Sequence, residues 1–214
     1  MPDNLQIELL SQHLSNFEFR QLFIELGWSN PTSEKSVEFS VSGESFTRRQ
    51  ISQLSGAVVF EISSTDGKIP ERNLRQKIQH EITKFHQENV LIFVDENRAN
   101  SLWYWTKFED KKKYPREHLY IKGQPVDLML GKLTGMNFDI SEFDDEGNIL
   151  ITDVAQKLQK ALDIERVTKK FYGEFQTQHI DFLTHIYGIE NERDKKWYAS
   201  VILNRLMFIY FLQK

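Results

Sequence analysis

The stretch of residues 57–108 decides the fold of this chain. It begins with the nearly continuous apolar run AVVFEIS at 57–63 and ends with two further runs, VLIFVDE at 90–96 and SLWYWTKF at 101–108. Runs rich in β-branched and aromatic residues are typical of strands, and the nearly continuous apolar run at 57–63 is typical of a central strand. We therefore expect three strands in this stretch.

A helix is expected between the first two of these strands, and Pro70 opens it. Apolar residues recur there at steps of four, four and three residues, at Leu74, Ile78, Ile82 and Phe85. This spacing gives the helix one apolar stripe, which we expect to pack against the sheet.

The first part of the chain predicts one long helix and two more strands. Apolar side chains at mixed three- and four-residue steps favour a helix over residues 5–26, which Gly27 and Pro31 end. Short strand patterns follow at residues 37–41 and near residues 45–50.

This order of helix, strands, helix, strand and strand predicts an α/β domain with a small mixed sheet over residues 1–143. The turn DDEGN at 144–148 marks a boundary, and the apolar spacing predicts an α-helical connector over residues 150–214. Its last segment, KWYASVILNRLMFIYFLQK at 196–214, is apolar on nearly every side. Such a helix needs cover on more than one face, so we expect the chain to be a piece of a longer protein.

The composition of the chain indicates a folded protein without disulfides. Of its 214 residues, 40% are hydrophobic and 27% are charged, which excludes a disordered chain. It contains no cysteine, so thiolate metal sites, iron–sulfur clusters and a cysteine nucleophile are excluded. The sequence begins without a basic leader, and its longest apolar stretch, 201–212, is too short to span a bilayer. We therefore expect a cytoplasmic protein without membrane contact.

Basic and aromatic residues alternate over residues 98–122 of this otherwise acidic chain. Seven basic side chains stand there against three acids, and we take all seven as candidate DNA contacts: Arg98, Lys107, Lys111, Lys112, Lys113, Arg116 and Lys122. Six aromatic residues lie among them. Cations suit a phosphate backbone and rings suit unstacked bases, so the segment is compatible with nucleic-acid binding. The alternative is structural, because the aromatic alternation is also typical of a half-buried strand and the lysine run of a solvated turn.

Two glutamates on expected strands are candidates for metal-dependent chemistry. Glu38 lies in VEFSV and Glu61 in AVVFEIS. Metal-dependent phosphodiester cleavage needs carboxylates on adjacent strands to hold Mg²⁺, with a lysine close by. We take Glu38 and Glu61 as candidate metal ligands and catalytic residues, with Lys68 in the following loop as the candidate lysine. An acid on an apolar strand can equally face solvent or pair with a cation.

Five strings together suggest a family: FRQLFIELGWSN (19–30), AVVFEISSTDGKIP (57–70), REHLYIKGQPVDLMLGKLTGMNF (116–138), DIERVTKKFYGEFQTQHIDFL (163–183) and YASVILNRLMFIYFLQK (198–214). They resemble the N-terminal region of large bacterial type II restriction–modification DNA methyltransferases. These enzymes fuse a nuclease-like domain, a helical connector and an S-adenosylmethionine-dependent adenine methylase, and phage-exclusion methylases are similar.

The resemblance implies a restriction-endonuclease-like domain followed by a helical connector. The nuclease motif of that fold places an acid on one strand, then an acid and a lysine two residues apart on the next. It transfers only to Glu38 and Glu61, because Ser63 stands where the lysine is expected. The resemblance therefore implies either Mg²⁺-dependent DNA cleavage or a degenerate domain that contacts DNA without cutting it.

The same resemblance implies a methylase domain elsewhere in a longer chain. The N-P-P-Y tetrapeptide of the methylase is missing, and the single Asn-Pro pair is Asn30-Pro31 in the nuclease-like half. S-adenosylmethionine would then be a cofactor of the full-length protein only. The expected partners are DNA and the methylase domain. A different interpretation also fits the residues: a noncatalytic module whose aromatic and basic surface and apolar last helix bind proteins.

Overall fold

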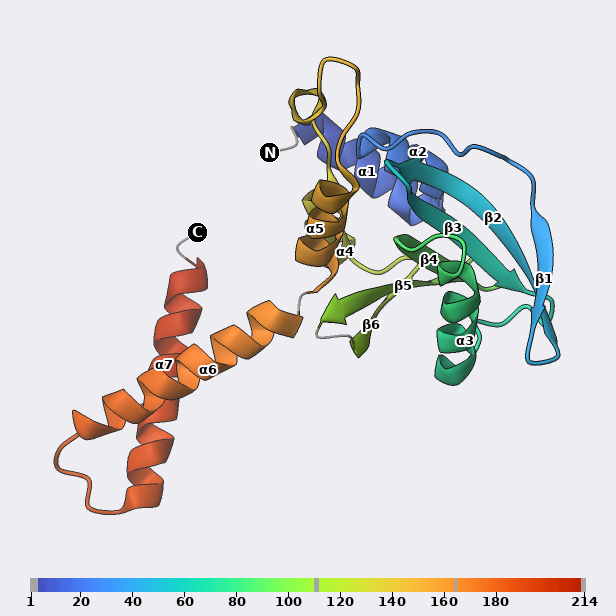
Figure 1. The fold of residues 1–214 in the computed structure, drawn as a ribbon. Helices are drawn as coiled ribbons and strands as arrows, with labels where there is room; N and C mark the ends of the chain where they lie inside the picture. The colour runs from blue at the N-terminus through green and yellow to red at the C-terminus, as the bar shows by residue number, and fades with distance from the viewer. Residues whose placement is uncertain (1–3, 110–111, 164, 213–214) are drawn as a thin grey trace. The chain divides into compact units, whose positions relative to one another are not determined.

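The computed structural model describes residues 4–109, 112–163 and 165–212 (Figure 1). The chain divides into two compact units, Met1–Asp163 and Ile164–Lys214. The first unit contains a sheet with helices on both sides, and the second unit contains two helices. The expectation of an α/β protein with a mixed sheet is confirmed.

Six strands form one sheet, and each lies beside its neighbours in sequence. The strands are β1 (Val37–Val41), β2 (Glu44–Leu54), β3 (Ala57–Ser64), β4 (Asn89–Val94), β5 (Asn100–Glu109) and β6 (Lys112–Ile121). Only β3 and β4 run parallel among these neighbouring pairs. Parallel strands need a crossover connection, and helix α3 (Arg72–Thr83) provides it.

Helix α3 covers one face of the sheet. Side chains of a strand point alternately to its two faces, and Phe60 and Ile62 of β3 point to the α3 side. There they join a buried cluster with Ile78 of α3 and Phe93 of β4. The apolar stripe expected for this helix therefore packs on the sheet as the spacing predicts.

Four helices contribute to the core on the opposite face: α1 (Asn4–Asn16), α2 (Phe19–Glu25), α4 (Asp127–Leu133) and α5 (Ile151–Leu162). Val59 of β3 and Trp103 of β5 belong to this larger core, in which Trp103 is 1% exposed. Glu61 follows Val59 by two residues and so faces the same side. This face holds the candidate site.

The single helix expected over residues 5–26 is wrong, because the chain breaks at Phe17. Phe17 has a φ of 59°, the left-handed region, and ends α1. The Phe17 amide donates to the Leu14 carbonyl, and the Glu18 amide donates to the His13 carbonyl, which is a Schellman cap. Glycine usually occupies that position, so a phenylalanine there gives no stop signal in the sequence.

Strand β6 is missing from the sequence expectations, whose structural alternative placed a solvated turn at the lysine run. Lys112 and Lys113 instead begin β6, which pairs with β5 along its length. This pairing also changes the character of β5, whose residues from Ser101 to Lys107 are buried on both faces. A strand half exposed to water was expected there.

The first unit extends through helix α5. The boundary expected between residues 143 and 150 lies N-terminal to this helix, which packs into the larger core through Val154 and Leu158. The second unit is formed by α6 (Glu165–Thr184) and α7 (Glu192–Leu212). These two helices contact each other, and His179 Nε2 lies 3.0 Å from Ser200 Oγ.

Candidate functional site

Two arginines hold the carboxylate of Glu61. Arg49 stands directly opposite Glu61 on β2, and its Nη2 lies 3.1 Å from Glu61 Oε1. Arg98, in the turn between β4 and β5, places Nη1 2.9 Å from Oε1 and Nη2 3.1 Å from Oε2. The Glu61 side chain is 12% exposed, whereas the two arginine side chains are 49% and 40% exposed. Two cations thus share one carboxylate, with their outer faces open to solvent.

Arg98 also ties this pair to the break between α1 and α2. Its Nη2 donates to the Phe17 carbonyl oxygen at 2.8 Å, and its guanidinium lies over the Phe19 ring. The Lys122 ammonium lies 5.9 Å from the centre of the Phe17 ring and is exposed. We call Arg49, Arg98 and Lys122 the basic cluster.

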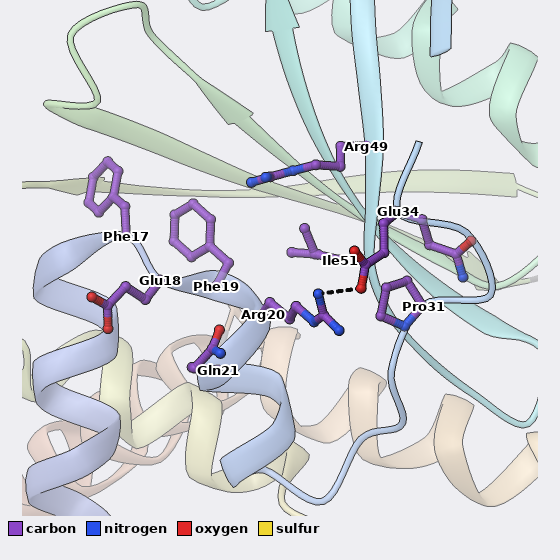
Figure 2. Close-up of a pocket in the computed structure, with 10 residues that line it drawn as sticks. Phe17, Glu18, Phe19, Arg20, Gln21, Pro31, Glu34, Arg49 and Ile51 are labelled. Atoms are coloured by element: carbon purple, nitrogen blue, oxygen red, sulfur yellow. Dashed lines mark ion pairs between the residues drawn. The ribbon is translucent and has the colours of Figure 1, made fainter. Parts of the chain in front are cut away.

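A cleft of about 260 Å³ opens beside the basic cluster, between α2, β2 and the loop that precedes β1. In Figure 2, Arg49 extends from β2 along one wall and Arg20 points from α2 toward Glu34. The Arg20 Nη1 atom lies 2.6 Å from Glu34 Oε1, and the guanidinium also donates to Asn30 Oδ1. The walls of the cleft therefore carry guanidinium groups that donate hydrogen bonds to oxygen atoms. Guanidinium groups bind phosphate oxygens in the same way.

Glu38 lies on the same face of the sheet as Glu61 but not beside it. Glu38 is on the edge strand β1 opposite Thr47, and Glu61 is on β3 opposite Arg49. Strand β2 lies between the strands of the two glutamates. Thr47 and Arg49 of β2 therefore stand next to Glu38 and Glu61, where a nuclease would need a second acid. Since both oxygens of Glu61 accept from guanidinium groups, these residues do not fit a Mg²⁺ site on Glu38 and Glu61. Within the described ranges, no three His, Asp or Glu side chains form a metal-binding group.

Lys68 lies away from Glu61. It lines a hollow with Leu102 and Leu119, and Leu102 belongs to the cluster on the α3 face. Glu61 faces the opposite side. The structure thus does not bring Lys68 to Glu61. At the position two residues after Glu61, where the motif has its lysine, Ser63 pairs with Thr47.

Two of the seven candidate DNA contacts hold a buried carboxylate. Lys107 Nζ lies 3.1 Å from Asp163 Oδ2, and Arg116 Nε lies 2.8 Å from Asp163 Oδ1. The side chains of Lys107 and Asp163 are 6% and 4% exposed. Burial raises the pKa of Asp163, but hydrogen bonds from Arg116 and Lys107 outweigh it and leave the pKa below its ordinary value. These two cations fasten the end of α5 to the sheet.

Lys112 and Lys113 lie at the start of β6, at the opposite end of this strand from Lys122. Lys112 and Lys113 are exposed, and the Lys113 ammonium lies 5.4 Å from the centre of the Phe108 ring. Lys111 falls outside the described residues. Of the interleaved aromatic residues, four are buried in the sheet, at Trp103, Tyr104, Trp105 and Tyr120. The structure therefore separates the basic segment into three places rather than one surface.

Arg49 is the residue that the sequence analysis missed. The available signal was its position in an expected strand that could pair with the strand of Glu61. A hairpin counted back from its turn, where Leu54 pairs with Ala57, would place Gln50 opposite Glu61. A bulge between Gln50 and Ser52 shifts the register by one residue and brings Arg49 there instead.

Comparisons with known protein families, with curated proteins and with solved structures find no match. No helix in the described part of the chain is long and apolar enough to cross a membrane.

Proposed function

We propose that the first unit is a nuclease-like domain that contacts DNA without cutting it, within a restriction–modification enzyme. The second unit is then the connector to a methylase domain of the same longer chain, where S-adenosylmethionine would bind. The observation that carries this proposal is the carboxylate of Glu61 held between Arg49 and Arg98. In a metal-dependent nuclease that carboxylate would bind a metal ion instead of guanidinium groups.

The order of elements supports the nuclease-like part of the proposal. The first unit begins with two helices and three antiparallel strands. A crossover helix follows, and then a strand that runs parallel to the third. A mixed sheet with one crossover helix is compatible with the restriction-endonuclease-like domain that the sequence resemblance implies. Glu61 lies on β3, two strands from Glu38 on β1, and Ser63 stands where the resemblance implies a lysine.

The charge around Glu61 supports DNA contact. Two half-exposed guanidinium groups share one carboxylate, which leaves a local excess of positive charge, and Lys122 adds to it. Arginines held in place by a carboxylate are fixed before a phosphate arrives, so less side-chain freedom is lost on binding. DNA contact of this kind is independent of sequence and depends strongly on salt.

The test measures binding and cleavage of a mixed-sequence plasmid with Mg²⁺, with Mn²⁺ and with a chelator. We expect binding without nicking in all three conditions. The triple variant R49Q/R98Q/K122Q should bind more weakly and lower the slope of log K against log salt by up to about 3, because each phosphate contact contributes roughly 0.9. Glutamine keeps most of each side chain, and melting temperatures check that the variant folds.

The matched control is R72Q/K77Q/K84Q, which removes three exposed cations from α3 on the other face of the sheet. It should leave the salt slope unchanged. Metal-dependent nicking that disappears in Glu61→Ala would instead identify a working nuclease and overturn the noncatalytic proposal.

One observation favours the alternative of a protein-interaction module. Helix α7 exposes large apolar side chains in the second unit, at Trp197, Leu206, Phe208, Ile209 and Leu212. An apolar surface of this kind is typical of a surface that another protein covers. Absence of DNA binding at low salt would favour this function over the first.

A further inference from the structure

A small cavity lies on the α3 face of the sheet, opposite the face of the basic cluster. It has a volume of about 180 Å³, lies between α3, β5 and β6, and is partly open to solvent. Its lining residues are Gln76, Gln79 and His80 from α3, Tyr104 and Thr106 from β5, and Lys113 and Pro115 from β6.

Thr106 gives the first indication of a ligand. It is 5% exposed, and its hydroxyl has no hydrogen-bond partner among the described residues. Tyr104 precedes it by two residues on the same face of β5, and the contact between the two hydroxyls falls short of the geometry of a full hydrogen bond. A buried polar group without a partner costs free energy, so a molecule in the cavity that hydrogen-bonds Thr106 is favoured.

Two glutamines add amide groups to the same cavity. Gln79 is 4% exposed, and its Nε2 donates to Thr83 Oγ1 at 2.8 Å, which fixes the amide and leaves its carbonyl oxygen to accept. Gln76 is exposed one helical turn earlier and borders the cavity. The cavity thus offers hydroxyl and amide groups that can both donate and accept.

Flat and charged surfaces complete the cavity. The Tyr104 and Pro115 rings provide apolar walls, and Lys113 provides an exposed ammonium group. A volume of about 180 Å³ is below the roughly 300 Å³ at which sites for drug-sized ligands begin, and suits one heterocyclic ring system. Donors and acceptors around a small space with apolar walls, with a cation at the side, match a base that carries a phosphate.

We propose that this cavity binds the base of a nucleotide, with Lys113 close to the phosphate. The nucleotide is either a free mononucleotide or an unpaired nucleotide of a single strand, since both present the same base and phosphate. The proposal does not depend on DNA contact by the basic cluster, which lies on the other face of the sheet.

The experiment titrates the whole chain with each of the four deoxynucleoside monophosphates, with deoxyribose 5-phosphate and with a short oligothymidylate, by calorimetry and by ligand-observed NMR. At least one monophosphate should bind, and deoxyribose 5-phosphate should bind at least about tenfold more weakly because it lacks the base. Equal binding of the sugar phosphate would overturn recognition of a base. Tighter binding of the oligonucleotide than of dTMP would identify a single strand as the source.

Three variants locate the site. Thr106→Val removes one hydroxyl at constant shape and should weaken binding about fivefold, the equivalent of one hydrogen bond. Gln76→Phe should abolish binding by filling the cavity from an exposed position, whereas Asn73→Phe, one turn earlier on α3 and outside the cavity, should leave binding unchanged. Binding by no monophosphate at millimolar concentration would show that the cavity holds water only, and binding unaffected by Gln76→Phe would place the nucleotide elsewhere.

Discussion

Arg49 and Glu61 stand opposite each other on β2 and β3 because Ile51 is accommodated in a bulge between them and the hairpin turn. Without this bulge, Gln50 would face Glu61 and the Arg49 side chain would point to the α3 face. The bulge therefore decides whether Glu61 meets a cation. Bulges near functional sites commonly redirect a side chain in this way.

Replacing Glu61 with glutamine should strengthen DNA binding. The change removes the negative charge between two guanidinium groups, so the positive potential at this surface rises. We expect the affinity for mixed-sequence DNA to increase by about three- to tenfold at 50 mM salt and by less at 200 mM, because salt screens the added field. Fluorescence anisotropy at both salt concentrations measures this.

Glu38→Gln is the matched control for that prediction. It removes the same charge from the same face of the sheet, but at an exposed position on the edge strand. We expect an increase of less than about twofold, in line with the stronger screening of exposed charges. Equal effects of the two variants would mean that net charge alone, and not the arginine pair, governs binding.

The sequence predicts the central strands and α3 because their patterns are strong and local. Residues 57–60 and 90–94 are buried on both faces, so burial alone selects apolar residues there. Apolar patterns of this kind do not predict the break at Phe17 or strand β6. Phe17 adopts a conformation in which glycine is usual, and β6 is an edge strand whose polar residues form ion pairs with α3 and with the end of α5.

The candidate site depends on contacts that are distant in sequence. Glu61 is recognisable as an acid on an apolar strand, but its two partners are 12 and 37 residues away. Lys107 and Arg116 look like free cations in the sequence, and only the fold brings Asp163 between them. Charge patterns therefore identified Glu61, Arg98, Lys107 and Arg116, but not Arg49 or Asp163, to which some of them are paired.

Asp163→Ala should destabilise the first unit strongly. It leaves the buried ammonium of Lys107 without one of its carboxylate partners, and removing one member of a buried ion pair costs about 3 kcal/mol or more. For a chain of this size that corresponds to a fall in melting temperature of roughly 6–12 °C. Thermal unfolding at pH 7 measures it.

The loss of stability caused by Asp163→Ala should be smaller in acid. Because the pKa of Asp163 is below its ordinary value in the folded chain, its stabilising effect is present above the pKa of an unfolded aspartate, about 3.9. The effect is lost as the pH falls through the lower folded pKa. The gap between wild type and variant should therefore be constant from pH 7 to pH 5 and narrower at pH 3. An unchanged gap at pH 3 would contradict the ionic role.

His118→Gln should flatten the stability of the protein between pH 7.5 and pH 5. His118 Nδ1 lies 2.7 Å from Lys132 Nζ, and Nε2 lies 3.0 Å from the Leu162 carbonyl oxygen, so the neutral ring fits this place. Burial, and then the charge of Lys132, lower the pKa of His118. The unfolded chain takes up a proton below about pH 6.5 before the folded chain does, so wild-type stability falls as the pH drops through this range.

The difference between the wild type and His118→Gln isolates this histidine. Burial and the charge of Arg48 also lower the pKa of His86, and burial raises the pKa of Glu88, but both groups are the same in the two proteins. We expect the melting temperature of the wild type, relative to the variant, to be lower at pH 5 than at pH 7.5. A difference independent of pH would show that His118 is not held neutral.

Gly27→Ala should be among the most damaging single substitutions in the first unit. Gly27 has a φ of 79°, and a Cβ atom there would overlap the Phe138 carbonyl group. The Phe138 amide donates to the Leu26 carbonyl at 2.9 Å, so the two segments cannot separate without losing this bond. Strain and overlap together should cost about 2–4 kcal/mol. Gly123→Ala, with a φ of 89° and open space around its Cβ, should cost only about 1–2 kcal/mol in chemical denaturation.

Lys112 and Lys113 test whether DNA also reaches the start of β6. Both side chains are exposed, and neither holds a buried carboxylate as Lys107 does. If they contact phosphates, K112Q/K113Q should lower the salt slope of DNA binding by about 1–2 without changing the melting temperature. K77Q/K84Q removes the same charge from α3 and is the control. An unchanged slope in K112Q/K113Q would confine DNA contact to the basic cluster around Glu61.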